Sequence, residues 1–119
     1  MSYSTILEII ESFYDIVKKD VMIGYHFRFI EDFETHIPRI ADFWNLQLNG
    51  ELKDKSNLPF DILATHTGIG IKRAEIGRWL MLFEMNLKTF LNHKKVTQKD
   101  VDLWNEKIEI FKNRIERSI

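Results

Sequence analysis

The four histidines of this chain carry the side chains best suited to bind a metal or to exchange a proton near neutral pH. Among them, His66 has the most informative surroundings. It ends a short segment of weak helical character, and Gly68 and Gly70 follow it before a long helix with an aromatic face. The glycines leave the backbone free to approach another group closely, and a neutral imidazole nitrogen is a good ligand for iron. From its position alone, however, His66 is more simply explained as the last residue of a helix.

The stretch from His66 to Phe83 carries a more specific signal, because Trp79 follows the histidine after thirteen residues and belongs to an Arg-Trp-Leu-Met-Leu-Phe run. This stretch resembles the proximal signature of the group III truncated haemoglobins. Two upstream segments resemble further motifs of the family in the same order: residues 13–20 resemble its first-helix motif, and residues 36–44 resemble its distal-helix motif. The resemblance covers roughly residues 5–90, and the final helix agrees only in being amphipathic and aromatic.

The resemblance implies an all-α fold, a truncated globin-like two-over-two helical sandwich around haem b, with His66 as the proximal ligand of the iron. It also implies that Tyr14, His36 and Trp79 are the polar residues of the distal pocket. Donors such as the Tyr14 hydroxyl and the Trp79 indole stabilise dioxygen on ferrous haem, because the bound gas gains negative charge. The apolar residues implied to line the pocket are Phe13, Phe27, Ile40, Phe43, Ile76, Leu80 and Phe83.

Three basic residues, Arg39, Lys72 and Arg73, are candidate partners of the haem propionates, although most such residues are ordinary solvated charges. The chain also departs from the family pattern. Residues 24–27 read Gly-Tyr-His-Phe where the family more often has Gly-Pro-Ile-Phe, and Ile76 replaces a residue that is usually Phe. The connection from Trp44 to His66 is a few residues longer than usual, which leaves the length of the proximal helix open.

The distal assignments have plainer alternatives. Tyr14 and Trp79 lie on the apolar faces of their predicted helices, where aromatic residues usually belong to the core. His36 lies near a helix start and is equally well explained as a solvated or capping residue. His26, in an aromatic segment, and His93, at an exposed helix end, receive no function.

Hydrophobic periodicity predicts helices throughout, and no segment alternates as a strand does. The first helix carries apolar residues from Ile6 to Val17 behind a capping box of Thr5 and Glu8, and a short helix is expected after Gly24. The second long helix is expected to start at Asp32 and to run past Pro38, which weakens or bends its start, towards Gly50.

A polar surface loop is predicted from Gly50 to Pro59, followed by a short helix at most over residues 60–66. The next long helix starts near Lys72, and the last opens at Thr97 and Asp100. With 119 residues and no linker-like stretch, the chain is expected to form one domain, a single truncated globin domain over residues 1–119.

Composition excludes several classes of function. The net charge of −1, with acidic and basic residues interspersed, gives no electrostatic footprint for nucleic acid. The absence of cysteine excludes disulfides and thiolate chemistry. The first residues lack the pattern of a signal peptide, and no apolar run is long enough to cross a membrane, so a cytoplasmic protein is expected.

The leading functional hypothesis is therefore a haem protein that binds O2, NO, CO or other diatomic ligands, in oxygen or nitric oxide binding, detoxification or sensing. The resemblance also permits nitric oxide dioxygenase or peroxidase-like activity, which needs an external reductant or reductase because nothing in the chain binds flavin or nicotinamide. The alternative hypothesis is a cofactor-free helical interaction module, in which the aromatic residues are only core.

Overall fold

The computed structural model describes residues 1–27, 33–51 and 70–119, and every regular element in these ranges is helical. The predicted all-α class is therefore confirmed for this part of the chain. Several predictions concern residues outside these ranges: His66 as the iron ligand, the Asp32 cap, most of the loop after Gly50 and the short helix over residues 60–66. The elements in chain order are α1 (Tyr3–Val17), the 3₁₀ helix η1 (Gly24–Phe27), α2 (Phe33–Asn49), α4 (Arg73–Asn92) and α5 (Gln98–Ser118).

The start of α1 differs from the prediction. Ser2 caps this helix, because its hydroxyl oxygen accepts a hydrogen bond from the backbone N–H of Thr5 at 3.2 Å. Thr5 and Glu8 therefore lie inside α1, and the capping box predicted for them is wrong. Ser and Thr are both favoured N-cap residues, but the cap is Ser2, three residues before the predicted Thr5.

The other helix starts and turns follow the sequence more closely. Thr97 and Asp100 form the predicted capping box at α5, with bonds of 3.2 Å and 3.0 Å between each side chain and the other's backbone N–H. The short helix predicted after Gly24 is η1, and α2 continues through Pro38 to Asn49. Gly24 is required at its position, since a Cβ there would lie 2.9 Å from the backbone oxygen of Lys18.

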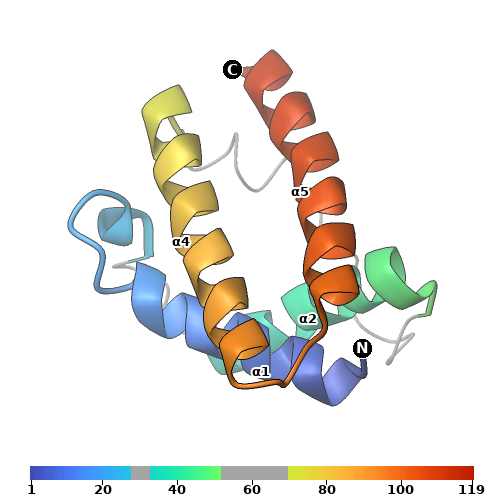
Figure 1. Cartoon of the computed structure of the whole chain (residues 1–119). Helices are drawn as coiled ribbons and strands as arrows, with labels where there is room; N and C mark the ends of the chain where they lie inside the picture. Colours follow the sequence, from blue (N-terminus) through green and yellow to red (C-terminus); the bar gives the residue numbers. More distant parts are fainter. Residues whose placement is uncertain (28–32, 52–69) are drawn as a thin grey trace.

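The helices are arranged as two pairs (Figure 1). α1 packs against α2 and α4, while α5 packs against α4 and α2. The helices α4 and α5 are joined by a short connection that lies beside α1 and α2. From this connection the two helices extend in the same direction and spread apart. The start of α4 and the end of α5 therefore lie at the open end of the pair.

The core lies where α4 and α5 meet the α1 and α2 pair. Its largest fully buried side chains are Phe13, Phe83 and Trp104, and Asn86 is among the polar residues buried in the described part of the chain. The Asn86 amide donates to the backbone oxygen of Ile9 at 3.1 Å and accepts from the Ser12 hydroxyl at 2.9 Å, which joins α4 to α1. None of the described helices combines the length and apolar character needed to cross a membrane.

Candidate functional site

Phe13 is the central residue of an aromatic cluster that joins α1 to α4. Its ring is buried and meets the rings of Tyr14, Trp79 and Phe83 edge-on, with centroid separations of 5.7, 5.5 and 4.8 Å. Edge-to-face contacts at such distances are the favoured arrangement of aromatic pairs. Phe13 thus contacts three other residues that the sequence analysis assigned to the same pocket.

Tyr14 brings η1 into the same cluster. Its ring meets that of Phe27 edge-on at 5.7 Å. Burial raises the pKa of Tyr14 above its ordinary value, because the charged phenolate is poorly solvated there. The Tyr14 hydroxyl therefore keeps its proton across the physiological pH range, and a protonated hydroxyl can donate a hydrogen bond.

Trp79 lies between this cluster and an apolar cavity. Its indole stacks on the Phe83 ring, with centroids 5.4 Å apart and an interplanar angle of 18°. Trp79 also lines the cavity between α2, α4 and α5, so this residue borders both features. The cavity is lined by Trp44, Ile71, Ile76, Trp79, Leu80, Ile108, Phe111, Lys112 and Ile115.

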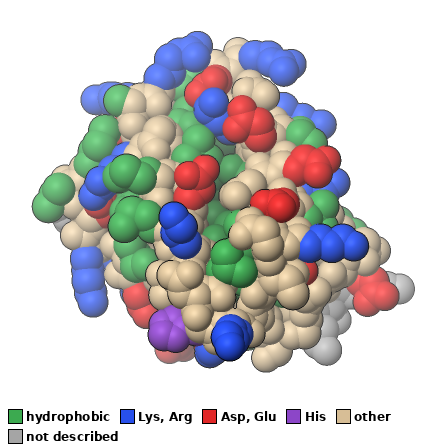
Figure 2. All heavy atoms as spheres, viewed as in Figure 1, with side chains coloured by type: hydrophobic (Ala, Val, Ile, Leu, Met, Phe, Trp, Pro, Cys, Tyr) green, Lys and Arg blue, Asp and Glu red, His purple; other side chains and the backbone are tan. Residues whose placement is uncertain are grey.

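The cavity is small and almost entirely apolar. Its volume is about 20 Å³, which is the space of roughly one water molecule. Cavities with apolar walls usually stay dry, since a water inside them finds no hydrogen-bond partners. Viewed from the side of α4 and α5, hydrophobic side chains are visible between the charged side chains of the two helices (Figure 2).

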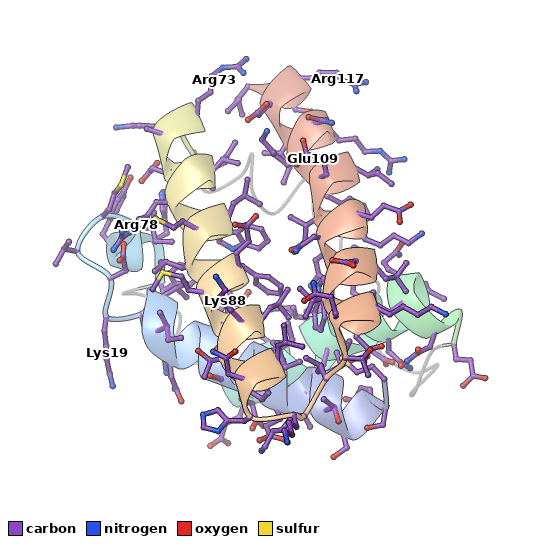
Figure 3. The ribbon with its side chains drawn as sticks, viewed as in Figure 1. Lys19, Arg73, Arg78, Lys88, Glu109 and Arg117 are labelled. Atoms are coloured by element: carbon purple, nitrogen blue, oxygen red, sulfur yellow. The ribbon has the colours of Figure 1, made fainter. Side chains whose placement is uncertain are left out.

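Two basic residues lie around this cavity at the open end of the helix pair. Lys112 of α5 lines the cavity, and its ammonium group lies 3.6 Å from Glu109 and 3.9 Å from Glu116. Arg73, the first residue of α4, donates to the backbone oxygen of Glu116 at 3.0 Å and so bridges α4 to α5. Figure 3 shows Arg73 at this end of α4, opposite the end of α5.

The remaining residues assigned to the pocket lie mostly on α2. Ile40 is buried, and Phe43 is half-buried and packs on Phe111 of α5 with ring centroids 5.3 Å apart. Arg39 is half-buried, whereas the side chain of His36 is exposed. Among the described residues, no group of three or more histidines, aspartates or glutamates is placed to hold a metal ion.

The sequence analysis missed the contribution of α5 to this region. Ile108, Phe111 and Ile115 line the cavity, although the sequence analysis described their helix only as amphipathic and aromatic. The signal was present, because a stripe with spacings of three and four must face a core. It was not connected to the pocket, since the family resemblance ends near residue 90.

The described residues have the chemical character of a haem pocket, but the cavity that they line is smaller than such a pocket. Aromatic and aliphatic walls with a cation nearby suit a flat apolar group that carries carboxylates. Binding pockets for cofactors of this size span roughly 300–1,000 Å³, far more than the cavity of about 20 Å³. The cavity beside Trp79, as the described residues form it, is therefore smaller than a pocket for haem.

In comparisons with known proteins, no family model, no curated protein and no solved structure matches the chain.

Proposed function

We propose that this chain is a haem protein of the truncated globin type, with a two-over-two helical sandwich, that binds dioxygen, nitric oxide or carbon monoxide. The observation that carries the proposal is the convergence around Trp79. Residues that a haem pocket would need come from α1, η1 and α4 and form one aromatic cluster, and Trp79 joins this cluster to an apolar cavity.

The residues that would enclose haem are the apolar residues of the cavity, above all Ile76 and Leu80 of α4 and Phe111 of α5. His66 is the proposed iron ligand, and Lys112 is the basic residue of the cavity lining that would balance a propionate. The haem supplies reversible binding of a diatomic gas at ferrous iron.

The protein's own contribution is to donate hydrogen bonds and to exclude water. The Tyr14 hydroxyl and the Trp79 indole N–H are donors, and both rings pack against Phe13. A donor stabilises a partly negative ligand most where water is excluded, because the local dielectric is low. Phe13 and Phe27 provide this exclusion around Tyr14, and slow release of dioxygen follows from it.

One observation favours the alternative of a cofactor-free helical interaction module. The cavity beside Trp79 has a volume of only about 20 Å³, so the described side chains of α2, α4 and α5 pack closely there. In that case Trp79 and Tyr14 are core residues and His66 has no ligand.

Titration of the haem-free protein with haemin separates these functions. We expect a Soret band that saturates at one haem per chain. His66→Ala should remove the spectrum of an imidazole-ligated haem, while His93→Ala, at the exposed end of α4, should leave it unchanged. Binding without saturation, or equal spectra for both variants, would exclude His66 as the iron ligand.

A further inference from the structure

A buried carboxylate, Glu75, connects η1 to the first turn of α4. Glu75 is 4% exposed. Its Oε1 accepts the backbone N–H of Lys72 at 3.0 Å, which caps α4. Its Oε2 accepts a hydrogen bond from the Tyr25 hydroxyl at 2.5 Å and lies 3.0 Å from Nε2 of His26, whose ring contacts that of Tyr25 at a tilt of 32°. One carboxylate therefore serves both as a helix cap and as an anchor for η1.

The anchor depends on the charge of Glu75. Burial opposes ionisation, but hydrogen bonds from Tyr25, from the Lys72 backbone and from His26 outweigh it and hold the pKa of Glu75 below its ordinary value. If a buried carboxylate loses these donors, hydrogen bonds no longer offset the free-energy cost of removing its charge from water. Removing either η1 partner therefore favours release of η1 from α4.

An ion pair fixes the other end of the same connection. Arg78, one turn after Glu75, donates through Nε and Nη2 to one Asp20 oxygen at 3.0 and 2.6 Å. The other Asp20 oxygen accepts the backbone N–H groups of Met22 and Ile23. Figure 3 shows Arg78 on the side of α4 that faces this connection. Residues 20–26 are thus held to α4 at both ends.

The anchored segment ends at the residue that packs on Tyr14. Phe27 directly follows His26, and its ring meets the Tyr14 ring edge-on at 5.7 Å. We propose that Glu75 is a positioning residue for Tyr14: through Tyr25 and His26 it fixes η1, and η1 presses Phe27 against the Tyr14 ring. The proposal deepens the proposed function and rests on it wherever the readout is ligand release.

The test uses variants of His26 and Glu75. His26→Leu and Glu75→Leu should speed release of dioxygen from the reconstituted protein by on the order of tenfold, the effect of one misplaced hydrogen bond of ordinary strength. His26→Gln, which keeps an N–H donor towards Glu75, should restore most of the slow rate. Failure of the Gln variant to rescue the rate would contradict a role for this hydrogen bond.

A double-variant comparison separates positioning from general stabilisation. If Glu75 acts through Tyr14, then Glu75→Leu should change the release rate little in a Tyr14→Phe background. Thr97→Ala removes the α5 cap, far from η1, and should lower stability without changing the rate. Equal rate changes in Thr97→Ala, or an undiminished effect of Glu75→Leu without the Tyr14 hydroxyl, would overturn the proposal.

A measurement on the haem-free protein keeps this proposal separate from haem binding. Glu75→Leu should move the NMR resonances of the Tyr14 ring and speed amide exchange over residues 24–27, whereas Thr97→Ala should do neither. If haem fails to bind, the proposed function fails while these spectra still decide whether Glu75 orients Tyr14. Unchanged Tyr14 resonances in Glu75→Leu would overturn the positioning role.

Discussion

The Trp79 indole meets the Phe13 ring edge-on at a centroid separation of 5.5 Å, and this contact joins the middle of α4 to α1. Tyr14, the next residue after Phe13, is thereby held on the same side of the cluster as η1. The contact explains how two donors from different helices, far apart in the sequence, reach one region of the molecule.

The Tyr14 hydroxyl is predicted to slow ligand release. Tyr14→Phe keeps the ring contacts with Phe13 and Phe27 and removes only the donor. A hydrogen bond to a partly charged ligand is worth about 1.5–3 kcal/mol, so dioxygen release should speed by roughly ten- to a hundredfold. Stopped-flow displacement by carbon monoxide measures the rate. Tyr3→Phe, at the start of the same helix, is the control, and equal rates for Tyr14→Phe and Tyr3→Phe would refute the role of Tyr14.

The Asp20–Arg78 pair is predicted to make stability depend on acid pH. The Arg78 hydrogen bonds lower the pKa of Asp20 in the folded protein, whereas an unfolded aspartate titrates near about 3.9. The contribution is therefore complete above about pH 5 and is lost as the pH falls through the lowered pKa. Urea unfolding at a series of pH values between about 6 and 3 measures the free energy of unfolding. This free energy should fall less with decreasing pH for Asp20→Asn than for the unchanged protein.

The control for this pair is Asp15→Asn. Asp15 is exposed, and its carboxylate forms an ion pair with the Lys18 ammonium at 3.7 Å. Exposed pairs of this kind contribute little. A pH profile altered as much by Asp15→Asn as by Asp20→Asn would show that the Asp20 hydrogen bonds are not the cause.

The Trp104 indole carries a buried N–H with no hydrogen-bond partner among the described residues. Trp104→Phe loses packing volume but also removes this unsatisfied donor, whose burial costs about 1–3 kcal/mol. The two effects oppose each other, so we expect the free energy of unfolding to change by less than about 1 kcal/mol. Trp104→Ala should lose about 3–5 kcal/mol. A loss of several kcal/mol in Trp104→Phe would mean that the N–H has an acceptor.

Haem is predicted to raise the melting temperature. A ligand that binds only the folded state adds about 2.7 kcal/mol at a free concentration a hundred times its Kd. Calorimetry with increasing haemin should show a continuous rise for the unchanged protein and a much smaller rise for His66→Ala. An identical melting curve with and without haemin would favour the interaction module.

The sequence was sufficient to predict the helices because their signals are local. The stripe of Trp104, Ile108 and Ile115 and the Thr97–Asp100 capping box each lie within one helix, and α5 follows them. The start of α1 was misplaced because Ser2 and Thr5 are both acceptable N-cap residues, and local preference does not distinguish them.

The site depended on information that is not local. Phe13, Tyr14 and Trp79 were grouped through a family resemblance, since no spacing rule relates residues on different helices. Glu75 was missed altogether, although a glutamate in the first turn of a helix is common. Its burial and its bonds to Tyr25 and His26 come from the packing of η1 on α4, which the sequence pattern does not encode.

The central claim, that haem binds in the region of Trp79, is tested most directly by optical spectra of the reconstituted protein in its oxidised, reduced and carbon monoxide-bound forms. We predict one haem per chain and a shift of the Soret band on reduction and again on addition of carbon monoxide. Haemin that remains in free form, with no saturating band and no carbon monoxide complex, would contradict the claim.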